Sequence, residues 1–110
     1  MLPNVDKYLN AIKADFAKFY EDAEDKQYAA SRIQEFNDGL EIIEGSKYLK
    51  IVKNSGSQRS IHSFICVKDN GKFKAGDVLK AASWAAPAKN FARANLFVGD
   101  FSKVRWTGVM

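Results

Sequence analysis

Cationic and aromatic side chains are interleaved in the last third of the chain, and this combination can contact an anionic partner. The cations between residues 72 and 105 are Lys72, Lys74, Lys80, Lys89, Arg93, Lys103 and Arg105. The rings among them are Phe73, Trp84, Phe91, Phe97, Phe101 and Trp106. In proteins that bind single-stranded nucleic acid, cations follow the phosphates and rings stack on the bases. The same residues also fit a plain arrangement in which the rings fill the core and the lysines are solvated.

Trp84, Asn90 and Arg93 are the most specific residues of this run. Asn90 and Arg93 are three positions apart, so on a helix they would meet on one face. Arg93 can hold an anionic ligand there, or it can satisfy carbonyl groups at a helix end. We expect a partner to contact the following residues: Lys80, Trp84, Lys89, Asn90, Arg93, Arg105 and His62.

Catalytic chemistry has little support in the sequence. His62 and Cys66 are the only histidine and cysteine, and on one strand they would be about 13 Å apart, too far for a Cys–His pair. One thiolate and one imidazole do not complete a typical zinc site, and the Gly71–Gly76 segment does not continue as a phosphate-binding loop. We therefore expect a protein that is not an enzyme and has no metal or cofactor. A small enzyme with a pocket around His62, Trp84 and Arg93 is the alternative.

Two amphipathic helices are predicted to precede these residues. Apolar residues recur at steps of three and four from Val5 to Ala23, and again from Ala29 to Ile43. The acidic residues around Asp25 suit the start of the second helix, and Gly45 suits its end. The short connection predicts an αα-hairpin over residues 3–44.

Strands are predicted after Gly45, where the apolar residues form short branched and aromatic runs. The expected strands are Lys47–Lys53, Ile61–Val67, Val78–Ala82 and Val104–Val109. Turn residues at 54–58 and at Asn70-Gly71 favour antiparallel hairpins. The run Ile61–Val67 is apolar on both faces, which places it in the middle of the sheet. A short third helix is expected from Pro87 to Asn95.

The fold expected from these elements is a single α+β domain over residues 1–110. Its helical hairpin, residues 3–44, would cover one face of a mainly antiparallel sheet of about four or five strands, formed by residues 46–110. A chain of 110 residues, 46% of them apolar, is long enough for one core and too short for two domains.

Charge is divided unequally along the chain. Residues 1–45 hold five Lys or Arg and ten Asp or Glu, a net charge of −5, whereas residues 46–110 hold twelve and three, a net charge of +9. This division fits a basic binding face, two elements that attract one another, or acidic helices beside a lysine-rich sheet. The absence of a long apolar run or a signal-like start, and the single cysteine, favour a cytoplasmic protein without membrane contact.

One long segment also resembles a known group of proteins. The sequence KFKAGDVLKAASWAAPAKNFARAN, residues 72–95, together with Gly45–Tyr48 and Val104–Gly108, resembles small proteins of unknown function encoded by tailed bacteriophages of marine bacteria. The resemblance spans nearly the whole chain. It implies a phage or marine metagenomic origin and a location in the host cytoplasm or the virion, and it implies no activity.

The function expected from the sequence is therefore that of a small non-enzymatic phage accessory or binding protein. A protein partner or self-association is the first expectation for its partner. The alternative is a single-stranded nucleic-acid-binding module that uses the basic and aromatic residues of the 72–106 region.

Overall fold

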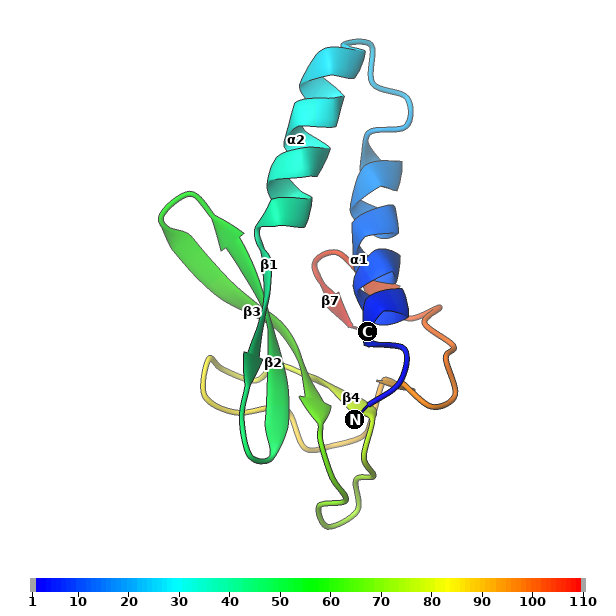
Figure 1. Ribbon diagram of the computed structural model, residues 1–110, viewed down its shortest axis with the longest axis vertical. Coiled ribbons are helices and arrows are strands. Elements are labelled where there is room, and N and C mark those ends of the chain that lie inside the picture. The colour runs from blue at the N-terminus through cyan, green and yellow to red at the C-terminus, as the bar shows by residue number, and fades with distance from the viewer. Residues whose placement is uncertain (1, 110) are drawn as a thin grey trace.

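A computed structural model describes residues 2–109. Two helices, α1 (Val5–Phe19) and α2 (Lys26–Asp38), precede a five-stranded antiparallel sheet whose strand order follows the chain (Figure 1). The strands are β1 (Leu40–Glu44), β2 (Tyr48–Ser55), β3 (Gln58–Cys66), β4 (Asp77–Lys80) and β5 (Ala94–Asn95). A small separate hairpin, β6 (Val104–Arg105) and β7 (Gly108–Val109), packs against α1 and the sheet. This is the α+β class that the sequence predicts, with a mainly antiparallel sheet.

Helix α1 covers one face of the sheet. Its buried residues Tyr8, Ile12 and Phe16 are four positions apart and so lie on one side of the helix. Tyr8 and Ile12 pack with Ile51 of β2 and Ile65 of β3 into the larger of two apolar clusters. Because these contacts join the start of the chain to its central strands, burial of this face accounts for the position of α1.

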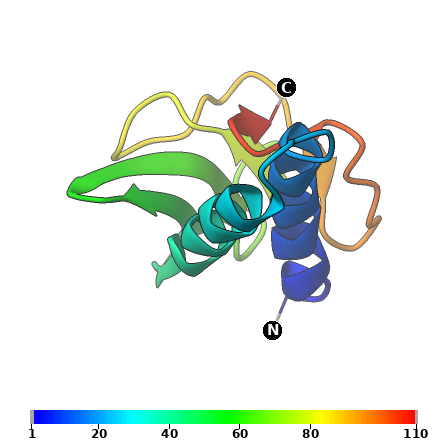
Figure 2. The ribbon, with the colours of Figure 1, turned by 90° about the horizontal axis from the view of Figure 1, so that it is seen from above.

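The opposite face of the sheet is covered by loops. Phe64, Cys66 and Leu79 are fully buried there and pack with Phe73. Phe73 belongs to the β3–β4 connection, and Ala81 and Ala92 of the β4–β5 connection pack against the same cluster. In Figure 2 the β4–β5 connection, drawn in yellow, and the helices lie on opposite sides of the sheet. The second half of strand β3, from His62 to Cys66, is therefore buried on both faces in the middle of the sheet, as the apolar pattern of residues 61–67 predicts.

The second helix ends earlier than the sequence predicts. It begins after Asp25, whose carboxylate accepts a hydrogen bond from the Tyr28 amide, but it stops at Asp38 instead of continuing to Ile43. The Gly39 carbonyl accepts hydrogen bonds from the backbone amide and the side-chain amide of Asn54, and Leu40–Glu44 then pairs with β2. Tertiary pairing with β2 therefore overrides the helical spacing of Leu40 and Ile43. In the described residues, neither helix has the length and apolarity that crossing a bilayer requires.

The third helix predicted at Pro87–Asn95 is wrong. The β4–β5 connection makes hydrogen bonds to its neighbours instead of helical ones: the amides of Ala88 and Arg93 donate to the carbonyls of Lys80 and Val78. Ser83 Oγ also accepts from the amides of Ala85 and Ala86. These side-chain bonds and the backbone hydrogen bonds to β4 compete with helix formation. The alanine content of the segment does not reveal this competition.

The last predicted strand is in fact a tight hairpin. Val104 pairs with Val109 and Arg105 with Gly108, so Trp106 and Thr107 form the turn. The Trp106 amide donates to Asp15 Oδ2 of α1 at 2.9 Å. This bond fixes the hairpin turn against the helix and directs the Trp106 ring toward α1 and α2.

Strand β3 contains a bulge at His62. Ile51 pairs with Ser63 and Val52 with Ile61, so His62 is the extra residue on β3. The bulge turns His62 to the α1 side, together with Ser63, whereas Phe64 and Cys66 face the loops. His62 and Cys66 therefore lie on opposite sides of the sheet, and not on the same side as strict alternation predicts.

Candidate functional site

Trp84 lies at the centre of a cationic and aromatic cluster that we call the Trp84 cluster, formed by Trp84, Lys50 and Arg59. Lys50 Nζ is 5.0 Å from the centroid of the Trp84 ring, and Arg59 Cζ is 5.3 Å from it. The ring is nevertheless 44% exposed. Arg59 is held by Glu41 at 2.8 Å, and hydrogen bonds from Asn54 and then from Arg59 lower the pKa of the Glu41 carboxyl. The cluster thus presents an accessible ring with cations in contact.

Asn90 and Arg93 meet, but in a loop and not on the helix that their spacing assumed. Arg93 donates to Asn90 Oδ1 at 2.8 Å, and its guanidinium lies 3.8 Å from the centroid of the Phe91 ring. Lys72 Nζ donates to the Asn90 carbonyl at 2.6 Å. Lys72, Asn90, Phe91 and Arg93 form what we call the Arg93 cluster, which also carries an exposed ring and two cations.

The other predicted contact residues are dispersed. Lys80 is exposed at the end of β4 and lines a small cavity of about 290 Å³ with His62. Arg105 donates to the carbonyls of Ser102 and Val104 in its own turn. Lys89 is exposed in the β4–β5 connection. Within residues 2–109, no hydrogen bond or cation–π contact joins Lys89, Arg105 or His62 to Trp84.

His62 belongs to a buried chain of hydrogen bonds. Its Nε2 is 2.6 Å from the Arg105 carbonyl, which can only accept, so Nε2 carries the proton. Nδ1 therefore accepts from Ser63 Oγ at 2.9 Å, and Ser63 Oγ in turn accepts from the Tyr8 hydroxyl at 2.6 Å. Burial lowers the pKa of His62 to about 4, against the opposing effect of the Arg105 carbonyl and with a small contribution from the Lys53 charge. Burial also raises the pKa of Tyr8, so this chain of groups is neutral.

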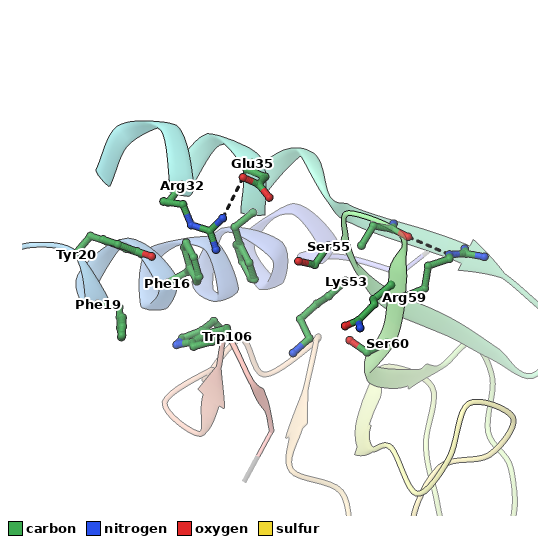
Figure 3. A pocket seen from close by; sticks show the side chains of 13 residues that line it. Phe16, Phe19, Tyr20, Arg32, Glu35, Lys53, Ser55, Arg59, Ser60 and Trp106 are labelled. Atoms are coloured by element: carbon green, nitrogen blue, oxygen red, sulfur yellow. Dashed lines mark hydrogen bonds and ion pairs between the residues drawn. The ribbon is translucent and has the colours of Figure 1, made fainter. Parts of the chain in front are cut away.

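A second candidate site is a cavity of about 340 Å³, here called the helix–hairpin pocket (Figure 3). It lies between the two helices, the tip of the β2–β3 hairpin and the turn of the β6–β7 hairpin. Its apolar wall is aromatic: Phe16 and Phe36 stack with centroids 4.1 Å apart, and Trp106 meets Phe16 edge-on at 5.1 Å. Phe19 lies edge-on to Trp106 and is 64% exposed.

The polar wall of the helix–hairpin pocket is cationic. Lys53 Nζ lies 5.6 Å from the Trp106 centroid and 3.5 Å from the Thr107 carbonyl, and burial lowers its pKa. Arg32 contacts Glu35 at 3.2 Å through one terminal nitrogen, and its Nε is buried without a hydrogen-bond partner. The Tyr20 hydroxyl and Glu35 raise the pKa of Arg32.

The comparisons with known proteins identify a family. The model of a family of unknown function, DUF7717, matches residues 2–109. The chain belongs to this family. Searches of the curated proteins and of the solved structures find no match.

Sequence reasoning missed the helix–hairpin pocket of this DUF7717 chain. Of its residues, only Trp106 belongs to the basic and aromatic run that the sequence singles out, and Arg32 and Lys53 come from elements far apart along the chain. One signal was available in Phe19 and Tyr20. These aromatic residues continue the apolar stripe of α1 beyond Phe16, its last buried residue, which indicates a ring surface not used by the core.

Proposed function

We propose that this protein is a non-enzymatic binding protein that holds single-stranded nucleic acid on the loop-covered side of the sheet. The observation that carries the proposal is the Trp84 cluster, in which an exposed indole lies beside Lys50 and Arg59. A base stacked on such a ring contributes about 1–3 kcal/mol, and cations beside it can contact the flanking phosphates. The resemblance to proteins of tailed phages supports an accessory role in an infected cell.

The Arg93 cluster supports the same proposal. It adds a second exposed ring, Phe91, together with the cations Lys72 and Arg93. It lies in the same covering of the sheet as Trp84, because the β4–β5 connection carries both Trp84 and Phe91.

Three carboxylates on the sheet and in its β3–β4 connection are engaged by the protein itself. Glu41 binds Arg59, Asp69 accepts from the Ala75 amide, and Asp77 accepts from the Lys74 amide and from Asn95. Their negative charge is therefore held in place by local bonds, and the net charge of +9 over residues 46–110 favours an anionic polymer.

Fluorescence anisotropy with a labelled oligothymidylate tests this proposal. Trp84→Ala should weaken binding by about tenfold or more, because it removes the stacking surface. Lys50→Gln should weaken binding and make the slope of log K against log salt shallower by about 0.7, the value for one phosphate contact on a single strand. Lys18→Gln, which removes the same charge from an exposed position of α1, should bind like wild type. Absence of binding at low salt, or undiminished binding by Trp84→Ala, would reject the proposal.

A protein partner or a second copy of the chain is the second candidate. It is favoured by Phe97 and Val98, adjacent apolar residues that are 59% and 76% exposed in the connection between β5 and β6. Sedimentation velocity over a range of protein concentrations tests self-association. A concentration-dependent dimer that Val98→Lys abolishes would support this contact, and a monomer at all concentrations would leave only a different protein as partner.

A further inference from the structure

We propose that the helix–hairpin pocket binds a small aromatic anion, with the ring of the ligand against Trp106 and its acid group between Lys53 and Arg32. This site shares Arg59 with the proposed nucleic-acid surface and otherwise uses different residues. Lys50 and Lys53 lie on opposite faces of β2, and they contact Trp84 and Trp106 respectively.

The aromatic wall indicates the body of the ligand. The Phe16–Phe36 stack and the edge-on Trp106 form a rigid apolar surface at the pocket. Phe19 extends this surface into solvent, where core packing does not account for its position. Aromatic rings favour offset or edge-to-face contacts with one another, so a flat aromatic ligand fits this wall better than a branched aliphatic one.

The cationic wall indicates the acid group. Lys53 is half-buried, and among the ion pairs of residues 2–109 it has no carboxylate within 4.0 Å. An anion beside Lys53 would compensate its partial desolvation. Arg32 retains a buried Nε without an acceptor, although one terminal nitrogen binds Glu35. Figure 3 shows the Lys53 ammonium group and the Arg32 guanidinium directed into the same cavity from different elements.

Arg59, the third cation at the pocket, is not expected to contact the ligand. Arg59 donates to Asn54 and Glu41, and in Figure 3 its guanidinium points away from the cavity. Glu35 is the one carboxylate among the described residues that line the pocket, and Arg32 engages it. A site with Arg32, Lys53 and Glu35 therefore has a net charge of +1 and matches a ligand with one acid group.

The size of the cavity limits the ligand to a small molecule. About 340 Å³ is at the lower end of the range for small-molecule pockets, about 300–1,000 Å³. Two kinds of compound share the required chemistry, an aromatic carboxylate and a nucleoside monophosphate. The experiment below uses 2-naphthoate for the first and adenosine monophosphate for the second, each with a neutral counterpart, 2-naphthamide and adenosine.

The Trp106 indole is a direct reporter for binding. The chain has two tryptophans, so Trp84→Phe identifies the Trp106 indole N–H signal in a nitrogen–proton correlation spectrum. We expect at least one of the two anions to shift this signal saturably, with an affinity at least about tenfold above that of its neutral counterpart, as one charge-assisted contact provides. The anion that binds identifies the source of the ligand.

Matched lysine variants on one strand provide the control. Lys53→Met keeps the apolar stem of the side chain and removes its charge, and it should weaken binding at least about tenfold. Lys50→Met makes the same change on the other face of β2 and should leave the affinity of the helix–hairpin pocket for the anion unchanged. The dispersed amide signals of both variants verify folding.

Any of three results would overturn the proposal. The first is the absence of a saturable shift of the Trp106 signal with either anion at about 5 mM, a concentration at which even weak ligands bind. The others are equal binding by the neutral counterparts and equal losses of affinity in the two lysine variants. Oligonucleotide binding is expected to depend on Trp84 and Lys50, whereas the Trp106 titration depends on Lys53. The outcome of the oligonucleotide experiment therefore does not decide whether the pocket binds an anion.

Discussion

His62 shows how a polar side chain is accommodated in this core. Its ring is 2% exposed, and both ring nitrogens have partners, Ser63 and the Arg105 carbonyl. The hydrogen-bond chain from Tyr8 through Ser63 to His62 joins α1, β3 and the β6–β7 hairpin. A buried polar group that is fully hydrogen-bonded is tolerated and favours one arrangement of the elements around it. The histidine therefore has a structural role in this fold.

Acid should destabilise the protein through His62. The pKa of His62 is about 4 in the folded protein and about 6.5 when unfolded, so between these values the unfolded state binds more protons. The free energy of unfolding should be unaffected by His62 above about pH 6.5, fall as the pH decreases toward 4, and lose about 3 kcal/mol at most. Urea unfolding of wild type and His62→Gln from pH 7 to 4 measures this contribution, because the carboxylates common to both chains cancel. Parallel pH profiles for the two chains would contradict the expectation.

Ser63 should contribute more to stability than the Tyr8 hydroxyl. In Ser63→Ala the buried Tyr8 hydroxyl loses its 2.6 Å partner and retains only His62 Nδ1 at 3.5 Å, which costs about 1–3 kcal/mol. In Tyr8→Phe the serine still donates to His62, so the loss should be about 1 kcal/mol. The double variant should lose less than the sum of the two single losses, which a double-mutant cycle by urea unfolding measures. Additive losses would show that the two hydroxyls do not interact.

At the scale of elements, periodicity predicts what lies between the ends of a segment better than the ends themselves. The start and interior of helix α1, the start of α2 near Asp25 and the central strand β3 agree with the sequence pattern, but α1 ends at Phe19 and does not continue to Ala23 as its apolar spacing predicts. The sequence does not predict strand β1, because its apolar residues fit a helical turn equally well. In the structure Ile42 packs on the α1 side of this edge strand and Ile43 lies on the other face. The bulge at His62 leaves no local mark, since it arises from pairing with β2.

The candidate sites differ in how far sequence could predict them. Trp84, Asn90 and Arg93 were identified by residue type, and Asn90 and Arg93 do meet. Their real neighbours, Lys50 and Lys72, are distant in sequence and depend on how the β4–β5 connection covers the sheet. The helix–hairpin pocket combines residues from α1, α2, β2, β3 and the β6–β7 turn, so only the tertiary arrangement reveals it.

The junction between α2 and β1 should be intolerant of any side chain at Gly39. A Cβ added there would overlap the Asn54 carbonyl oxygen. Because this oxygen belongs to backbone paired with Gly39, it cannot move without breaking the junction, and Gly39→Ala should cost more than about 2 kcal/mol. Gly56→Asn in the β2–β3 turn is the matched control: Gly56 has a φ of 61° and open space around it, and asparagine tolerates this conformation. Thermal unfolding compares the two, and equal losses would contradict the clash.

At the scale of the whole molecule, the shape is elongated, with extents of 48 × 29 × 24 Å. Helix α2 accounts for much of the length, since it continues away from the sheet beyond the end of β1 (Figure 1). The β2–β3 hairpin separates the proposed nucleic-acid surface from the helix–hairpin pocket. A ligand in the pocket would contact α1, α2 and both hairpins. Its binding would therefore stabilise α2, the helix with the fewest buried residues, in its place beside α1.

Helix α2 should open more readily than α1. Of its 13 residues, all within the described part of the chain, only Ala29 is buried, whereas α1 buries Tyr8, Ile12 and Phe16. Local opening is easiest where few apolar contacts are lost. Hydrogen exchange of the backbone amides should therefore show protection in α2 at least about tenfold below that in α1. Equal protection in the two helices would indicate that they open only together.

The position of Cys66 makes the chain a kinetic reporter of its own unfolding. This residue is the only cysteine, its side chain is fully buried, and burial together with the Asp77 carboxylate raises the pKa of its thiol to about 11. A thiol reagent cannot react until β3 separates from the loops that cover it, because the reactive thiolate is both inaccessible and scarce. Under strong labelling conditions the rate of modification then equals the rate at which the central strand is uncovered, without any added probe.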